Sequence, residues 1–258
     1  MKLQIKGETA LMKKTLVIMT TIALSAVLAA PAKASIADDF RNNLTKDAME
    51  PFAADFGGLI GLSDFHTGSA VGFPGFDVGV TVNGQFSPGK GDTILESASI
   101  KTFAVPMVQA TIGLPFDFEA CVRGVGYSGN TLIGGGLRYG VMKHTLAKFL
   151  PDIMAGIFYD KFKNDSLDLN HLSASVSATF DLPFVKPFIG IGIDRTKLTA
   201  QVPSSWGLPV AAGDSVTVTK PRLSAGVNIT PFPLTYIYGG YCWLHGNNGF
   251  TAGLGARF

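Results

Sequence analysis

From Gly75 onward the chain alternates apolar residues with polar residues or glycine at a period of two. In residues 76–83, Phe, Val, Val and Val alternate with Asp, Gly, Thr and Asn. Successive side chains of a β-strand point to opposite faces, so each such segment has one apolar and one polar face. The pattern predicts about ten strands, within a range of roughly eight to twelve. It recurs in residues 108–114, 118–123, 136–139, 173–180, 189–194, 222–229 and 250–258.

Two kinds of connection are expected between these strands. Some breaks contain proline, which cannot donate to a strand ladder and so predicts a tight turn. These are residues 114–117, 182–184 and 231–233. Polar or glycine-rich stretches predict longer connections, at residues 87–100, 128–131, 162–166, 199–214 and 245–248. Short and long connections therefore alternate, except that 142–151 predicts a helical turn on the short side.

The first 34 residues are typical of a secretory signal peptide. Lys13 and Lys14 give a positive start, residues 16–30 are uncharged and apolar, and Ala32-Lys33-Ala34 suits signal peptidase. We expect cleavage before Ser35, and a retained membrane anchor is the alternative. Because the segment carries five lysines and one glutamate, its removal changes the formal net charge from +2 to −2. No basic patch then remains to favour nucleic acid.

Residues 35–70 precede the first predicted strand and form a separate N-terminal segment. Ile36, Phe40 and Leu44 recur every four residues, which predicts a helix over 36–50 that Pro51 ends. Residues 52–70 are apolar but interrupted by glycines, and their pattern assigns no element. Because their large apolar side chains would otherwise face water, we expect this segment to dock as a plug from the periplasmic side. A mobile tail is the alternative.

Composition narrows the fold class. Charged residues make up 16% of the chain, against about 25% in ordinary soluble domains. Beyond residue 30 no apolar run reaches roughly 18 residues, which excludes a helical membrane bundle. Alternating segments of about ten residues, even in number, are typical of a transmembrane antiparallel up-and-down β-barrel, an all-β fold. A soluble sandwich or lipocalin-like barrel, with its apolar face inward, is the alternative.

Aromatic residues support the membrane interpretation. Those near the predicted tight turns, where an interfacial girdle belongs, are Phe116, Phe118, Phe184, Phe188, Phe232 and Tyr236. The chain ends on Phe258, and apolar residues recur at every second position back to Phe250 through Leu254. In these features residues 71–258 resemble the bacterial outer-membrane β-barrel class.

That resemblance implies a location in the outer membrane of a Gram-negative bacterium. It also implies that Phe250, Leu254 and Phe258 act as an assembly signal. The expected partners are outer-membrane lipid, the barrel-insertion machinery and periplasmic chaperones. Nucleic acid is not an expected partner, and the sequence leaves the oligomeric state open.

The chain is also loosely similar to barrels related to the long-chain fatty-acid transporters. The similarity rests on residues 75–80, on Gly136-Leu137-Arg138-Tyr139 and on Leu150-Pro151-Asp152. Those transporters have a longer barrel and a plug that opens with Asn-Pro-Ala, neither of which is recognisable here. Transport of a hydrophobic ligand is therefore an alternative function.

Charged residues on the predicted strands occupy the alternate positions of the polar face, so they are expected to point into the lumen. The interior of a small barrel is only wide enough for side chains, so these residues predict a plugged barrel stabilised by ion pairs. A narrow constriction that prefers anions, formed by the arginines, is the alternative. The predicted lumen cluster is Asp77, Glu119, Arg123, Arg138, Asp194, Arg222 and Arg257.

Histidines, serines and cysteines predict little chemistry. The four histidines lack the spacing of a metal site, so no metal or other cofactor is expected; they are His66, His144, His171 and His245. Asp168, His171 and Ser173 are too local in sequence to predict a hydrolase. Cys121 and Cys242 face the lumen from the predicted third and ninth strands, which are not neighbours, so a disulfide is not predicted.

The function that we expect is that of a non-enzymatic outer-membrane barrel. It is either structural or a narrow, porin-like pore for the transport of small solutes. Two alternatives are a transporter or binder of a hydrophobic ligand, and a surface enzyme or adhesin that acts through residues 87–100 and 199–214. A hydrolase is a low-ranking form of the latter. An apolar lumen would favour the hydrophobic-ligand transporter, and the parity of the strands predicts a polar one.

Overall fold

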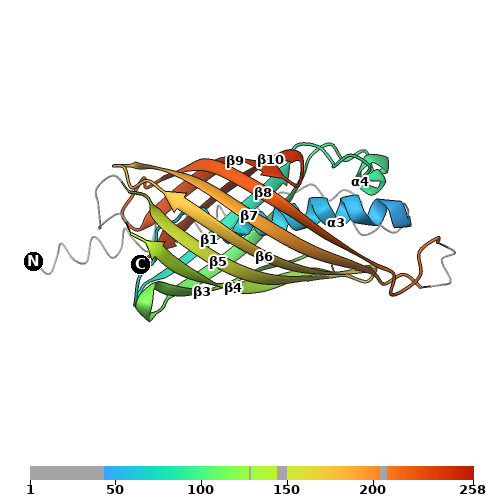
Figure 1. Cartoon of the computed structure of the whole chain (residues 1–258), viewed down its shortest axis with the longest axis horizontal. Coiled ribbons are helices and arrows are strands. Elements are labelled where there is room, and N and C mark those ends of the chain that lie inside the picture. The colour runs from blue at the N-terminus through green and yellow to red at the C-terminus, as the bar shows by residue number, and fades with distance from the viewer. Residues whose placement is uncertain (1–43, 128, 144–149, 204–207) are drawn as a thin grey trace, which may run out of the picture. The chain divides into compact units, whose positions relative to one another are not determined.

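The described part of the chain folds into ten antiparallel strands that close into a barrel (Figure 1). Each strand pairs with its neighbours in the sequence, and β1 pairs with β10 to complete the ring. The prediction of a closed all-β barrel of about ten strands is confirmed. The strands are β1 (Phe76–Gln85), β2 (Phe103–Gly113), β3 (Phe118–Tyr127), β4 (Asn130–Met142), β5 (Asp152–Lys163), β6 (Leu167–Thr179), β7 (Val185–Ala200), β8 (Ser215–Ile229), β9 (Thr235–Leu244) and β10 (Asn247–Arg257).

The structure is a computed structural model that describes residues 44–127, 129–143, 150–203 and 208–258. These residues belong to one unit, Ile36–Phe258. The predicted signal peptide, its cleavage site and residues 36–43 of the predicted helix lie outside the described residues, as does most of the predicted helical turn at 142–151. None of the helices in the described ranges is long and apolar enough to cross a bilayer.

The seam between β1 and β10 closes the ring by backbone hydrogen bonds. The Phe76 N–H donates to the Phe258 carbonyl at 2.9 Å, and the Phe258 N–H donates to the Phe76 carbonyl at 2.8 Å. Farther along the seam Asp77 pairs with Arg257 and Gln85 with Gly249. The sheet therefore has no free edge, which satisfies its backbone polar groups without water.

The two ends of the barrel differ in their connections. The turn end carries the tight turns after β2, β6 and β8, the connection 143–151 and the C-terminus. The loop end carries 86–102 and 201–214, but its other three connections are tight. The prediction of long connections at 128–131, 162–166 and 245–248 is wrong, because the strands extend almost to the end of each hairpin. Three residues at the loop end, Asn164, Ser166 and Leu167, close one such hairpin by backbone and side-chain hydrogen bonds.

An α-helix, α3 (Lys46–Gly61), and a short 3₁₀ turn, η1 (Leu62–Asp64), occupy the lumen. The Thr45 hydroxyl caps α3 by accepting from the Ala48 N–H at 3.3 Å. The prediction that Pro51 ends a helix is wrong, since Pro51 lies inside α3. An internal proline costs about 3 kcal/mol, and burial of large apolar side chains such as Phe52 and Phe56 gains roughly 2 kcal/mol each. Packing therefore outweighs the missing hydrogen bond.

The plug segment, defined here as residues 44–75, runs from the loop end to the start of β1 at the turn end. Figure 1 shows α3 at the loop end, opposite the C-terminus. The first turn of α3 lies beside the β7–β8 connection, where Lys46 pairs with Asp214 at 3.4 Å. The segment thus docks inside the barrel, and its helix lies at the loop end rather than at the end expected to face the periplasm.

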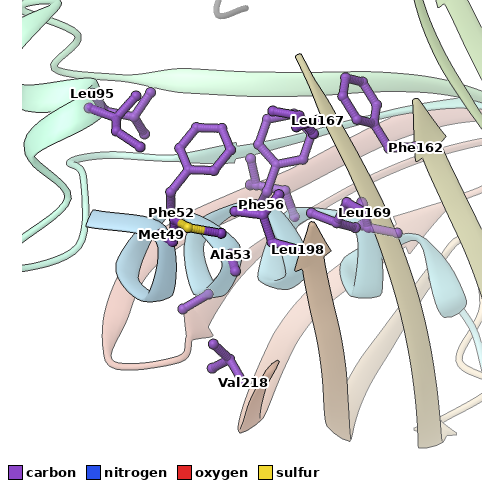
Figure 2. Close-up of a cluster of buried hydrophobic side chains, with 14 of the residues drawn as sticks. Met49, Phe52, Ala53, Phe56, Leu95, Phe162, Leu167, Leu169, Leu198 and Val218 are labelled. Atoms are coloured by element: carbon purple, nitrogen blue, oxygen red, sulfur yellow. The ribbon is translucent and has the colours of Figure 1, made fainter. Parts of the chain in front are cut away.

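The inner wall around α3 is apolar. Figure 2 shows Phe52 and Phe56 on α3 near Leu167 and Phe162 of the barrel wall. The Phe56 and Phe162 rings lie 5.3 Å apart. The expectation of a polar lumen therefore fails at the loop end, where the inward residues pack against the plug. These wall residues include Val105, Met107, Leu132, Phe162, Leu167, Leu169, Leu198, Ala200, Val218 and Leu244.

A second helix, α4 (Thr93–Ser97), lies in the β1–β2 connection and covers α3 at the loop end. Asp92 caps it, with its carboxylate accepting from the Leu95 N–H at 3.1 Å. Ile94 and Leu95 are fully buried in the cluster that α3 forms with the wall. The β1–β2 connection is therefore packed onto the plug.

The outer face of the barrel is apolar across its middle. On β7, Ile189, Ile191 and Ile193 are more than half exposed, and on β4 Ile133 and Leu137 are similarly exposed. A soluble barrel would place such residues inside, so the soluble alternative disagrees with this arrangement.

Aromatic residues at the turn end fall into two groups. Phe116, Phe118, Phe184 and Phe232 are exposed, as an interfacial girdle requires. Phe188 and Tyr236 are instead buried in the lumen, because their strand positions have inward parity. The prediction that these two belong to the girdle is wrong.

Candidate functional site

The seven predicted lumen charges all lie on the inner face of the barrel. Six are buried, and the side chain of Arg257 is 27% exposed. They form separate pairs rather than one ring. Arg222 pairs with Asp194 at 2.9 Å, Arg138 with Glu119 at 2.6 Å and Arg257 with Asp77 at 2.9 Å. Arg123 pairs with two acids outside the predicted set.

Asp64, at the end of η1, joins the plug to two arginines of the wall. Its Oδ1 accepts from Arg123 Nη1 at 2.9 Å, and its Oδ2 accepts from Arg222 Nη2. Ser173 and Ser175 of β6 also donate to Oδ2, Ser173 at 2.9 Å. Arg123 lies on β3 and Arg222 on β8, so one carboxylate of the plug links strands on different sides of the ring. We call this group the Asp64 node.

Each arginine of the node has a second acid on the wall. Arg123 binds Asp160 of β5 in a bidentate pair, with Nε and Nη2 at 2.7 and 2.6 Å from the two carboxylate oxygens. Arg222 binds Asp194 of β7 through Nε at 2.9 and 3.1 Å. The bidentate geometry of the Arg123–Asp160 pair is typical of strong ion pairs, and the two wall acids hold the arginines that Asp64 contacts.

His245 lies beside the node and contacts both α3 and the wall. Its Nδ1 lies 2.7 Å from the Ala54 carbonyl and its Nε2 lies 3.0 Å from Asp194. One imidazole ring therefore contacts both α3 and the wall acid Asp194, and so links the helix to the node.

Glycines leave room for the node. A side chain at Gly61 would place its Cβ 2.5 Å from Arg222 Nε and 2.6 Å from Asp194, and one at Gly192 would meet the same guanidinium at 2.7 Å. The Gly57-Gly58 pair, which interrupts an apolar stretch that the sequence leaves unassigned, lies inside α3, and Gly57 sits directly against Thr196. These glycines allow the helix to approach β7 and β8.

A second group of contacts holds the plug segment at the turn end. Glu119 accepts from the Val71 N–H, and the Ser69 hydroxyl donates to Asp152 at 2.5 Å. His66 lies between Tyr236 and Tyr238, with ring centroids 4.6 Å from each. The plug is therefore bound at both ends of the lumen.

Asp55 of α3 and Asp92 of the β1–β2 connection form a buried carboxyl pair. Asp55 accepts from the Gly89 N–H at 2.6 Å and from Asn247 Nδ2 at 3.2 Å. Burial raises the pKa of Asp92 to about 7, and the charge of neighbouring Asp55 adds to the rise. Burial also raises the pKa of Asp55. The two carboxyl groups lie close together, and a proton shared between them avoids two neighbouring buried negative charges.

The remaining candidates occupy different places. His171 and Ser173 face the lumen, but Asp168 has outward parity, so that triplet does not assemble; the acid nearest His171 is Asp194, at 3.6 Å. Cys121 and Cys242 are free and buried.

His144 lies outside the described residues. In the described part of the chain, no three His, Cys, Asp or Glu side chains are grouped to hold a metal ion.

Sequence reasoning missed Asp64, Asp160 and the role of His245. Asp160 lies on a strand whose apolar runs at 153–155 and 157–159 hide the alternation seen in the other strands. Asp64 lies in an irregular stretch without periodicity, and His245 follows a strand end. No sequence pattern brings these residues together, because the node depends on the position of the plug.

Comparisons with known proteins give distant structural neighbours. No protein-family model matches the chain, and no curated protein matches it. The translocator domain of the autotransporter NalP from Neisseria meningitidis is 11% identical, with a TM-score of 0.43, over 83% of this chain and 100% of that one. The N-terminal β-barrel domain of Pseudomonas aeruginosa OprF is 11% identical, with a TM-score of 0.35, over 72% of this chain and 98% of that one.

A third solved structure, the Yersinia pestis outer membrane protein Ail, is 16% identical, with a TM-score of 0.31, over 70% of this chain and 99% of that one. The chain is thus distantly similar to bacterial outer-membrane barrels, and these neighbours indicate no specific likeness to fatty-acid transporters. The strand pairing, rather than this likeness, establishes the closed barrel.

Proposed function

We propose that the protein is a non-enzymatic β-barrel of a bacterial outer membrane whose lumen is closed by its own plug segment. The apolar outer face supports the membrane location, because such a surface is stable in contact with lipid and costly in water. In this orientation the turn end faces the periplasm and the loop end faces outward.

The Asp64 node is the observation that supports a closed lumen. One carboxylate of the plug binds Arg123 and Arg222, which the wall acids already hold. Removal of one partner from a buried ion pair leaves an uncompensated charge and costs about 3 kcal/mol or more. A structural, plugged barrel therefore fits the node better than an open pore does. The arginines of the node bind carboxylates and so do not line a free anion path.

The test compares Asp64→Asn with the matched variant Asp47→Asn, which removes the same charge from an exposed position on α3. The protein is purified from the membranes of expressing cells, and conductance is recorded in planar bilayers. We expect no steady conductance from the wild type or from D47N. A loss of about 3 kcal/mol in D64N raises the released fraction of the plug about 100-fold, and channel openings appear.

The two native cysteines give a second readout. Cys121 packs beside Phe65 of the plug segment, and Cys242 lies in the cluster around α3. A water-soluble maleimide is expected to react slowly with the wild type and much faster with D64N. Steady conductance of the wild type would refute the closed lumen. A folded D64N barrel without conductance and with unchanged labelling would refute the role of Asp64.

A hydrophobic-ligand carrier is a second candidate, favoured by the apolar inner wall at the loop end. A ligand would reach this wall only after α3 moves. A fluorescent fatty-acyl probe is then expected to bind D64N and not the wild type. Absence of binding to a D64N barrel whose cysteines have become reactive would count against this candidate.

A further inference from the structure

The outward-facing charges of the strands gather on one side of the barrel. Within the described strands, outward parity and exposure identify five charged residues, all on β5, β6 and β7 near the loop end. Four are cations and one is an acid, which gives a local net charge of about +3 at neutral pH. We call this group the basic patch: Lys161, Lys163, Asp168, Arg195 and Lys197.

The strand register brings these cations close to one another. Lys161 is level with Asn170, and Asn170 is level with Lys197 on the next strand. Neighbouring strands lie about 4.8 Å apart, so the two lysine backbones are about 10 Å apart, and their flexible side chains can reach one anion between them. Tyr159 donates to the Asn170 amide oxygen at 2.8 Å and fixes its orientation.

None of the four cations forms an ion pair with any residue in the described ranges. The acid of the patch, Asp168, accepts a hydrogen bond from Gln201 at 3.3 Å. Two lysines at the turn end differ in this respect, since Lys143 pairs with Asp117 and Lys186 with Asp181. The patch therefore holds positive charge that the protein itself does not neutralise.

A hollow adjoins the patch on the outer face. It has a volume of about 430 Å³ and is lined by Thr131, Ile133, Lys161 and Lys163, with Asn164 and Asp165 at its loop-end rim. Arg195 stands level with Leu172 and Tyr159. An apolar row lies directly below, toward the middle of the barrel, where Ala174 stands level with Ile157 and with Ile193.

The opposite side of the barrel provides the contrast. There the loop end carries exposed aromatic side chains on or beside β1, β9 and β10. Phe86 packs against Phe250 and Tyr241, with ring centroids 5.5 and 6.3 Å apart. Aromatic and cationic residues both suit the lipid–water interface, but only the cations attract phosphate.

We propose that the basic patch binds the phosphate-bearing headgroup of a lipid in the outer leaflet. This inference rests on the proposed membrane location, since the patch lies just above the apolar belt. A molecule with both acyl chains and a phosphate contacts the belt and the cations at once, whereas a soluble anion uses the cations alone. Lys161 and Lys197 hold the phosphate, and the hollow beside Lys163 accommodates part of the headgroup.

The test measures lipid binding to the purified, delipidated barrel by native mass spectrometry. The double variant K161Q/K197Q is compared with K90Q/K101Q, which removes two exposed lysines from the β1–β2 connection at the same end. The probes are phosphatidylglycerol and phosphatidylcholine with the same acyl chains, and glycerol phosphate without chains.

We expect the wild type and K90Q/K101Q to bind phosphatidylglycerol more tightly than phosphatidylcholine. Each lysine near an anionic lipid contributes enough that K161Q/K197Q should bind phosphatidylglycerol roughly 30-fold more weakly. Equal binding by both double variants would overturn the proposal. Glycerol phosphate that binds as tightly as the lipid would also overturn it, and would indicate a soluble anion instead.

Insertion into phosphatidylcholine vesicles is measured in parallel for all three proteins. A wild type that fails to insert would refute the membrane location and the inference with it. Normal insertion of K161Q/K197Q with lost lipid preference supports the patch, because it separates headgroup binding from folding.

Discussion

Stability of the plug's attachment to the β1–β2 connection is expected to depend on pH through Asp92. This carboxyl lies against Asp55 of α3, and burial raises its pKa to about 7. In the unfolded chain an aspartate titrates near 3.9. Asp92→Asn keeps the shape of the side chain and its capping oxygen for α4, and it replaces the shared proton by a permanent amide donor.

The sign of the effect follows from proton binding. Between about pH 4 and pH 7 the unfolded chain loses the proton of Asp92 while the folded protein retains it. The stability contributed by this group is therefore complete below about pH 4 and declines as the pH rises toward 7. A pKa difference of about 3 units corresponds to at most about 4 kcal/mol, and the pairing with Asp55 makes this an upper bound.

Urea unfolding in phosphatidylcholine vesicles, measured from pH 4.5 to 8.5, provides the assay. We expect the wild-type midpoint to fall with rising pH and D92N to depend less on pH, so that D92N is the more stable protein near pH 8. Glu96→Gln removes a carboxylate from the exposed face of α4 and serves as the matched control, with the wild-type slope. Identical slopes for the wild type and D92N would refute this reasoning.

Two further predictions concern the lumen. Glu119→Ala leaves the guanidinium of Arg138 buried without its partner, so the free energy of unfolding should fall by about 3–5 kcal/mol. The double variant E119A/R138M should recover most of this loss. Temperature-dependent gel mobility of the folded barrel measures both variants, and additive losses would contradict the pairing. Gly61→Val places carbon atoms against Arg222 and Asp194, so it should lower the free energy of unfolding by about 1–3 kcal/mol and increase maleimide labelling of the lumen cysteines. Unchanged labelling would contradict the close packing of α3.

The barrel could be predicted from the sequence because its strands face two different environments. Residues 173–180 and 189–194 alternate strictly, so the pattern fixes which side chains face inward. Parity alone therefore identifies the inward positions of Asp194 and Arg222. The closing pair β1–β10 also follows, because a sheet that spans lipid cannot leave an edge unpaired.

The plug and its binding site could not be predicted in the same way. A helix that fills a lumen is surrounded by protein, so its apolar residues do not fall on one stripe and its period is weak. In the sequence, Pro51 and the glycine pair at 57–58 resemble helix breakers, but all three lie inside α3, which its packing in the lumen stabilises. The apolar inner wall at the loop end is unpredicted for a related reason: its residues pack against α3, whose position the strand pattern does not reveal.

The path of the plug has a consequence for its kinetics. Residues 46–75 pass lengthwise through a ring that is hydrogen-bonded all the way round, and they continue directly into β1, which is part of that ring. The arrangement resembles an axle threaded through a macrocycle and tethered to its rim. The axle cannot leave sideways unless a strand pair opens, so it leaves only lengthwise, and its tether keeps a withdrawn axle beside the mouth of the ring. A substitution that weakens the contacts therefore raises the fraction of time that the axle is withdrawn, while re-entry remains an intramolecular step.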